Sequence, residues 1–229
     1  MAKDIVGISS MATRRILADL KERYQRKTGQ SVTIESVGGV DATRRVRAGE
    51  QFDVVILADD VMRNLEAEGH VKSGSRAGFA ESAIAVAVRS GAALPVLTDE
   101  ATTKAAILQA RSICYSTGPS GTHLLKLFQK WDIDRVMSER LVQAPAGVPV
   151  GALLARGEAE LGFQQESELL DVPGIEIAGP LPREIQSLTL FSCGVGSQAL
   201  NERGAMDLVS YLTSEESNAS KRRHGMEPP

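Results

Sequence analysis

Short apolar runs alternate with helical patterns along the whole chain, and this alternation restricts the fold more than any other feature. Runs such as Phe52–Leu57 lead into segments such as Asp60–Glu68, where apolar residues recur at helical spacing. The alternation is typical of an α/β protein with a largely parallel sheet. Strands are expected at Ile5–Ile8, Val32–Glu35, Phe52–Leu57, Ala83–Val88, Ser112–Tyr115, Leu141–Gln143, Ala159–Phe163, Ile175–Ala178 and Ser187–Ser192. Helices are expected at Met11–Arg26, Ala42–Ala48, Asp60–Glu68, Glu100–Ala110, Thr122–Trp131, Val150–Arg156, Glu166–Leu170, Ala205–Leu212 and Ser217–Arg223. Several of these helices end at a glycine, which predicts left-handed caps at Gly29, Gly49, Gly69 and Gly157.

Composition excludes several classes of function. The 229 residues, 42% of them hydrophobic, are enough for one or two globular domains with a sizeable core. A net charge of −3, 4% aromatic residues and no basic stripe beyond Lys221–Arg223 argue against binding of nucleic acid. No apolar run approaches a membrane span, so membrane insertion is not expected. Phosphate-binding loops, zinc spacings and nucleophile elbows are absent from the sequence, so we expect no cofactor and no metal.

The start of the chain and its two cysteines leave alternatives open. A strand-like run begins almost at once within Met1–Gly7, which is unlike a signal peptide. The protein is therefore either cytoplasmic or periplasmic with its signal removed. Cys114 and Cys193 lie in strand-like runs and are interpreted as small buried hydrophobic residues, with a disulfide as the alternative.

Three junctions between an expected strand and an expected helix carry small hydroxyl residues or glycines. They are Ser9-Ser10, Gly38-Gly39-Val40-Asp41 and the loop Ser116–Thr122. Such junctions expose free backbone N–H groups at the positive end of a helix dipole, and hydroxyl groups add further donors. We therefore expect a small anion to bind there, at the carboxyl ends of the strands.

A purely structural interpretation stands beside this one. Serine, threonine and aspartate are ordinary N-caps, and glycine-rich turns are ordinary connections between strands and helices. Ser10 and Asp41 in particular are natural caps for the helices that follow them. Only the recurrence of the same pattern at three junctions favours an anion site.

The chain also resembles the molybdate-type periplasmic solute-binding proteins. The resemblance lies in VGISSMATRRILADLKERYQRKTGQSVTIESVGGVDATRRVRAGEQFDVVILADD, ARGEAELGFQQESELL and LTSEESNASKRRHGMEPP. It implies a type II periplasmic-binding-protein fold, with two α/β lobes and a ligand cleft between them. By this resemblance residues 1–86 and 188–229 form one lobe and residues 87–187 the other. Gly179–Pro182 is expected to be a crossing point between the lobes.

The resemblance also implies which residues bind the ligand. Relatives hold a tetrahedral oxyanion through serine hydroxyls, backbone amides and a tyrosine. The first serine corresponds to Ser9-Ser10, but the chain has no hydroxyl at Gly38–Val40, where the second is expected, and no tyrosine after Leu161-Gly162. Gln164 and Gln165, which offer both donors and acceptors, stand there instead, so we place a small carboxylate ahead of molybdate. The candidate ligand-binding residues are Ser9, Ser10, Gly38, Gly39, Val40, Ser116, Thr117, Ser120, Gly121, Thr122, Val148, Gln164 and Gln165.

Two functions follow from these expectations. The first is a monomeric binding protein that captures a small anion and delivers it to the permease of an ABC transporter. The alternative is an isomerase of aconitate-like unsaturated carboxylates on the same scaffold, which needs an acid or base to move a proton. Its candidate catalytic residues are Asp41, His123 and Glu166.

Overall fold

A computed structural model describes residues 3–145 and 147–229, which divide into two compact units. The first unit contains the chain up to Ser82 together with Thr189–Pro229, and the second contains Ala83–Leu188. The crossings therefore lie at Ser82/Ala83 and Leu188/Thr189, whereas the sequence analysis placed them after residues 86 and 187. Gly179–Pro182, the expected crossing point, lies inside the second unit instead.

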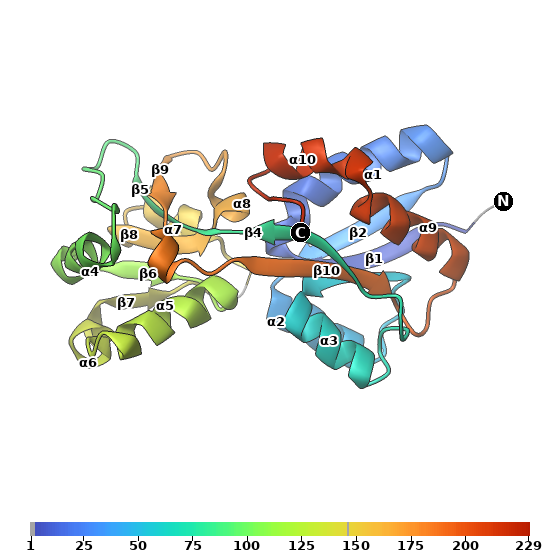
Figure 1. Ribbon diagram of the computed structural model, residues 1–229, viewed down its shortest axis with the longest axis horizontal. Helices are drawn as coiled ribbons and strands as arrows, with labels where there is room; N and C mark the ends of the chain where they lie inside the picture. Colours follow the sequence, from blue (N-terminus) through green and yellow to red (C-terminus); the bar gives the residue numbers. More distant parts are fainter. Residues whose placement is uncertain (1–2, 146) are drawn as a thin grey trace. The chain divides into compact units, whose positions relative to one another are not determined.

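The first unit is built on a five-stranded sheet of order β2-β1-β3-β10-β4 (Figure 1). Its strands are β1 (Ile5–Ser10), β2 (Val32–Val37), β3 (Val54–Ala58), β4 (Ala77–Ser82) and β10 (Thr189–Val195). β1 pairs in parallel with both β2 and β3, while β10 is antiparallel to β3 and to β4. The three parallel strands thus end at the same edge of the sheet.

Helices cover both faces of this sheet (Figure 1). One face carries α1 (Arg14–Thr28), α9 (Glu202–Thr213) and α10 (Asn218–Arg223), and the other carries α2 (Gly39–Arg47) and α3 (Asp59–Ala67). Single turns of 3-10 helix, Met11–Thr13 and Glu215–Ser217, precede α1 and α10. Ile5 of β1 packs in the core with Leu17 of α1, whereas Ile8 packs with Met62 of α3. Each such buried aliphatic side chain contributes about 1.5–3 kcal/mol to stability, so both faces anchor the sheet.

The second unit repeats this plan with the sheet order β7-β6-β8-β5-β9 (Figure 1). Its strands are β5 (Ile84–Arg89), β6 (Ile113–Tyr115), β7 (Leu141–Gln143), β8 (Leu161–Gln165) and β9 (Ile175–Pro180). β6 is parallel to β7 and β8, and β5 is antiparallel to β8 and β9. One antiparallel strand next to a parallel trio is therefore common to both sheets.

The helices of the second unit also lie on two faces. Those that share one core are α4 (Glu100–Gln109), α5 (Pro119–Lys130) and α6 (Asp134–Met137), and those on the opposite face are α7 (Val150–Ala155) and α8 (Glu166–Leu169). Two 3-10 turns, Ser138–Arg140 and Arg183–Ile185, complete the unit. Val86 of β5 faces the α5 side, while Ala85 and Ala87 face α7, as expected of alternating strand residues.

Each expected strand and helix has a counterpart in the structure, and the α/β class is confirmed. The expectation of a largely parallel sheet is wrong, because β10 and β5 pair antiparallel with both of their neighbours. The sequence analysis missed β4, whose sequence AGFAES offers Phe79 as its one large apolar residue, and it missed the short α6. The left-handed caps at Gly29, Gly49, Gly69 and Gly157 are confirmed by φ angles of 72°, 81°, 81° and 75°.

Two further expectations concern membranes and thiols. Within residues 3–145 and 147–229, every helix is too short or too polar to cross a membrane. Cys193 in the first unit and Cys114 in the second are both free and buried, so the disulfide alternative is wrong. Burial raises the pKa of each thiol to about 12, which keeps both groups protonated at neutral pH.

Candidate functional site

The hydroxyl-bearing loops lie where parallel strands end, once in each unit. We call the residues at the ends of β1 and β2 and at the start of α2 the first half-site; they are Ser9, Ser10, Ser36, Gly38, Gly39 and Val40. The second half-site lies at the ends of β6 and β8 and at the starts of α5 and α7; it contains Ser116, Thr117, Ser120, Gly121, Thr122, Val148, Gln164 and Gln165. Each half-site is described within its own unit.

A pair of serines joins β1 to β2 in the first half-site. The register of the two parallel strands places Ser9 opposite Ser36, and their Oγ atoms lie 2.8 Å apart. Ser9 is completely buried. The sequence analysis missed Ser36 because it looked for a second hydroxyl only at Gly38–Val40. The available signal was a serine at the end of a strand that precedes a double glycine.

Ser10 differs from Ser9 because its hydroxyl has no partner. Only 7% of Ser10 is exposed, and its Oγ atom makes no hydrogen bond with any residue that the structure describes. Ser10 occupies the N-cap position of the turn Met11–Thr13, as expected, but its side chain accepts no N–H there. A buried hydroxyl without a partner costs about 1–3 kcal/mol, a cost that a bound ligand would remove.

The start of α2 lies against Ser10. A Cβ atom added to Gly39 would be 4.0 Å from the Cβ of Ser10. The first N–H groups of an α-helix have no partner within the helix, so the first turn of α2 offers backbone donors next to the unpaired hydroxyl. Asp41 is not the cap of α2, because Gly38 holds that position and Asp41 forms an ion pair with Arg44.

A buried carboxylate lies at the end of β3, the strand beside β1. Asp59 opens α3, is 9% exposed, and accepts hydrogen bonds from Ser192, Arg63 and Arg76. Burial alone would raise the pKa of Asp59, but these hydrogen bonds outweigh burial and hold the pKa below its usual value. The sequence analysis missed this network, for which a pair of aspartates directly after a buried strand was the available signal.

The hydroxyl groups of the second half-site bond to one another. Ser116 and Ser120 have Oγ atoms 3.0 Å apart, and the N–H of Gly118 donates to Ser116 Oγ over 3.2 Å. The Thr122 hydroxyl donates to the Gly118 carbonyl over 3.3 Å, and Thr117 is exposed. These bonds fix the loop before a ligand arrives.

Gly121 is required by close packing in the same loop. A Cβ atom at this position would lie 1.8 Å from the carbonyl oxygen of Ser116 and 2.9 Å from Cδ2 of Tyr115. Only glycine can let the start of α5 approach the end of β6 this closely.

The side chain of Gln164 forms hydrogen bonds to two helices. Its Oε1 atom accepts from the N–H of Val150 at the start of α7 over 3.0 Å, and its Nε2 atom donates to Glu168 of α8 over 2.8 Å. Gln165 beside it is 1% exposed. Val148 is half-buried just before α7, and its N–H donates to the carbonyl of Pro145 over 2.9 Å.

The two candidate catalytic residues of the second unit lie on helices that cover opposite faces of its sheet. His123 lies on α5, where Nε2–H donates to the carbonyl oxygen of Ile185 over 2.7 Å. Glu166 opens α8, and its N–H donates to the carbonyl of Ala83 over 2.9 Å. Asp41 belongs to the first unit. A catalytic role for these residues stays a prediction.

Metal ligands are not grouped in the part of the chain that the structure describes. No cluster of three or more histidine, cysteine, aspartate or glutamate side chains there has a geometry that could hold a metal ion. The chemistry of both half-sites is therefore that of hydroxyl groups, amides and helix N-termini.

Comparison with known proteins gives the family. The profile of the family described as bacterial extracellular solute-binding protein matches residues 5–227. A protein named aconitate isomerase, from Pseudomonas sp, is 33% identical over 99% of this chain and 90% of its own length. The molybdate-binding protein ModA of Azotobacter vinelandii is 25% identical over 86% of this chain and 79% of its own length.

Solved structures agree with that match. The periplasmic molybdate-binding protein of Azotobacter vinelandii superimposes with a TM-score of 0.80 at 20% identity, covering 99% of this chain and 100% of that one. The fold is thus that of the type II periplasmic binding proteins, and the molybdate-type resemblance is confirmed. The chain belongs to the bacterial extracellular solute-binding protein family.

Proposed function

We propose that this protein binds a small carboxylate anion through hydroxyl and backbone N–H groups of the first half-site. The observation that carries the proposal is Ser10, whose buried Oγ atom lacks a partner beside the start of α2. A ligand oxygen would accept from this hydroxyl and from the free N–H groups of the helix. Neutral donors bind an anion without burying a competing ion pair.

The ligand class is a di- or tricarboxylate of the aconitate type, ahead of molybdate. The relative named aconitate isomerase matches this chain over more of its length and at higher identity than ModA does. Gln164 and Gln165 stand where the molybdate-type pattern has a tyrosine, which also favours a ligand other than a bare tetrahedral oxyanion.

As a binding protein of this family, the chain would act outside the cytoplasmic membrane. Its family is described as bacterial extracellular solute-binding protein. A permease of an ABC transporter would then be the partner that receives the anion.

Isomerisation is the second candidate function, and the match to the protein named aconitate isomerase favours it. In such a reaction a base removes a proton from one end of an allylic system, the double bond shifts, and a proton is returned at the other end. The reaction needs no oxidant or reductant, only an acid or base within reach of the carbon that reacts.

Two measurements on the purified protein test these functions. A thermal-shift panel should contain cis-aconitate, trans-aconitate, citrate, succinate, molybdate, tungstate and sulfate. A ligand that binds only the folded state stabilises it by about 2.7 kcal/mol at a hundredfold excess over its Kd. We expect the tricarboxylates to give the largest shift and Ser10→Ala to reduce it, whereas stabilisation by molybdate alone would contradict the proposed ligand class.

Proton NMR of trans-aconitate in D2O then separates binding from catalysis. Appearance of cis-aconitate or exchange of carbon-bound protons, at a rate proportional to protein concentration, would establish the isomerase. Binding without either change would establish a binding protein. A sample of Ser10→Ala prepared in the same way controls for a contaminating enzyme. The variant should isomerise the substrate more slowly because it binds it more weakly, whereas a contaminant would act equally in both samples.

A further inference from the structure

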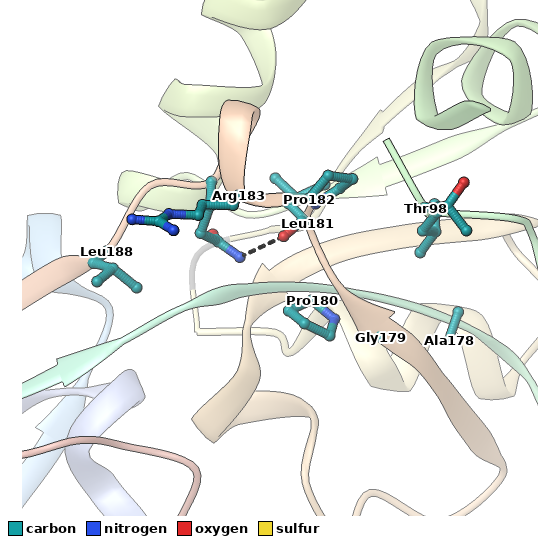
Figure 2. Close-up of a pocket in the computed structure, with 10 residues that line it drawn as sticks. Thr98, Ala178, Gly179, Pro180, Leu181, Pro182, Arg183 and Leu188 are labelled. Atoms are coloured by element: carbon teal, nitrogen blue, oxygen red, sulfur yellow. Dashed lines mark hydrogen bonds between the residues drawn. The ribbon is translucent and has the colours of Figure 1, made fainter. Parts of the chain in front are cut away.

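An open apolar pocket lies in the second unit, formed by residues that do not belong to the second half-site (Figure 2). Its volume is about 890 Å³. The walls are the end of the 92–98 segment, the C-terminal part of β9 and the chain that follows it. The lining residues are Leu97, Thr98, Ala178, Gly179, Pro180, Leu181, Pro182, Arg183, Gln186 and Leu188.

The pocket adjoins a concentration of exposed large aliphatic side chains. Leu188 in its wall is 59% exposed, and Leu94 and Val96, in the segment that leads to Leu97, are 49% and 60% exposed. Single exposed apolar residues are ordinary, but an exposed leucine in the wall of an apolar hollow favours a ligand with an apolar part. The volume lies in the range of small-molecule sites, about 300–1,000 Å³.

Arg183 supplies the one charge of the pocket. Its side chain is exposed and makes no ion pair or hydrogen bond with the residues described, and the described residues that line the pocket include no acidic side chain. The neighbouring Glu184 points to the start of α4, where its carboxylate accepts the N–H of Glu100 over 2.9 Å. Figure 2 shows the guanidinium of Arg183 directed toward the Leu188 end of the pocket, with Thr98 and Ala178 at the other end.

The pocket wall is held by hydrogen bonds. The Gln186 amide donates to the carbonyls of Ile84 and Leu181 over 3.0 and 3.2 Å, and its oxygen accepts from the N–H of Ile84 over 2.9 Å. The bond to Leu181 is drawn in Figure 2. These three bonds tie the wall that follows β9 to the start of β5.

We propose that this pocket binds a medium-chain fatty acid, with its alkyl chain along Leu97, Leu181 and Leu188 and its carboxylate on Arg183. An apolar wall with a single unpaired cation at one end complements a molecule with an apolar body and a single anionic end. The compact, highly charged carboxylates proposed for the first half-site would gain nothing from the apolar wall. The site is thus distinct from the half-sites in both residues and ligand.

Decanoate and its uncharged analogue decanol are the probes that test this site. Binding is followed by methyl NMR of leucine-labelled full-length protein, in which Leu97, Leu181 and Leu188 report from the wall. We expect decanoate to shift these methyl signals and Arg183→Gln to weaken decanoate binding by about fivefold, the size of one partly solvated ion pair. Decanol should bind equally to both proteins, because it has no charge for Arg183 to pair with.

Matched variants separate the pocket from the rest of the surface. Ala178→Trp should fill the pocket and abolish decanoate binding, whereas Ala93→Trp, in the exposed part of the 92–98 segment, and Arg135→Gln, an exposed charge on α6, should leave it unchanged. Ser10→Ala should also leave it unchanged, which keeps this outcome independent of the proposed function. Unshifted leucine methyls, or equal binding by wild type and Ala178→Trp, would overturn the proposal. Decanoate that binds equally to wild type and Arg183→Gln would refute the assigned role of the cation.

Discussion

The two half-sites follow equivalent strands of two similar sheets and each contains a bonded pair of serines, yet they differ in one further hydroxyl group. In the first, Ser10 keeps a buried Oγ atom without a partner. In the second, Ser116 and Ser120 bond to each other, and the amide of Gln164 is used at both ends. The first half-site therefore has one buried hydroxyl group available to a ligand, whereas Ser116, Ser120 and Gln164 of the second bond within their own unit.

This difference teaches how one sequence pattern can serve two purposes. A strand followed by small hydroxyl residues and a helix predicts either an anion site or a set of caps and turns. The unsatisfied hydroxyl separates the two, because a structural hydroxyl is paired in the unliganded protein and a ligand-binding hydroxyl need not be.

Alanine at the two glycines should give the largest contrast between the half-sites. Gly121→Ala would place a Cβ atom 1.8 Å from the Ser116 carbonyl oxygen, and we expect a loss of about 3 kcal/mol in the free energy of unfolding. Gly39→Ala meets only Ser10 Cβ at 4.0 Å and should stabilise α2 by about 0.5–1 kcal/mol. Urea unfolding followed by circular dichroism measures both. Equal stability of the two variants would show that the second loop is not tightly packed.

Ser10→Ala should give the next largest effect, and on affinity instead of stability. Removal of the free hydroxyl leaves a ligand oxygen unpaired and should weaken binding of the best ligand by about 1–3 kcal/mol. The melting temperature of the free protein should stay the same or rise, since the unpaired buried group is gone. Isothermal titration calorimetry measures the affinity, and differential scanning calorimetry measures the melting temperature. A lower melting temperature with normal affinity would mean that Ser10 is structural.

Ser120→Ala should show the reverse pattern with a smaller amplitude. It deletes the hydrogen bond to Ser116, so the free energy of unfolding should fall by about 1 kcal/mol. The affinity should fall less than in Ser10→Ala. Both variants belong in the same calorimetric series, and a larger affinity loss in Ser120→Ala would invert the comparison.

Acidification should give the smallest effect, a loss of stability through Asp59 and its arginine partners beside the first half-site. The pKa of Asp59 is lower in the folded protein than in the unfolded chain, so its stabilisation is complete above the unfolded value of about 3.9 and is lost as the pH falls toward the folded value. Asp59→Asn should therefore flatten the loss of stability as the pH falls below the unfolded pKa of about 3.9. Unfolding curves at several pH values provide the measurement.

The strands and helices could be predicted because their apolar periodicity is local. β4 was missed because it is a strand through its pairing with β10, not through its own apolar pattern. The antiparallel direction of β10 and β5 relative to their neighbours could not be predicted either, because an apolar run does not show whether a strand pairs parallel or antiparallel.

The positions of the candidate loops could be predicted from the sequence, but the hydrogen-bond partners of their side chains could not. Ser9 bonds to Ser36 only because the register of β1 and β2 brings them together, and Ser192 reaches Asp59 across 133 positions of the chain. The same holds for His123, whose partner Ile185 is 62 positions away. Partners at such separations follow from tertiary packing, which a single sequence does not show.

The position of β10 has a consequence for the order in which the protein folds during synthesis. β10 lies between β3 and β4 in the first sheet, yet it follows the entire second unit in the chain. As the polypeptide leaves the ribosome, Ala83–Leu188 is complete and contiguous while β4 still lacks its neighbour. Domains usually fold from the N-terminus onward. Here we expect the middle of the chain to reach its native state first, and the segment that begins the protein to wait for the segment that ends it.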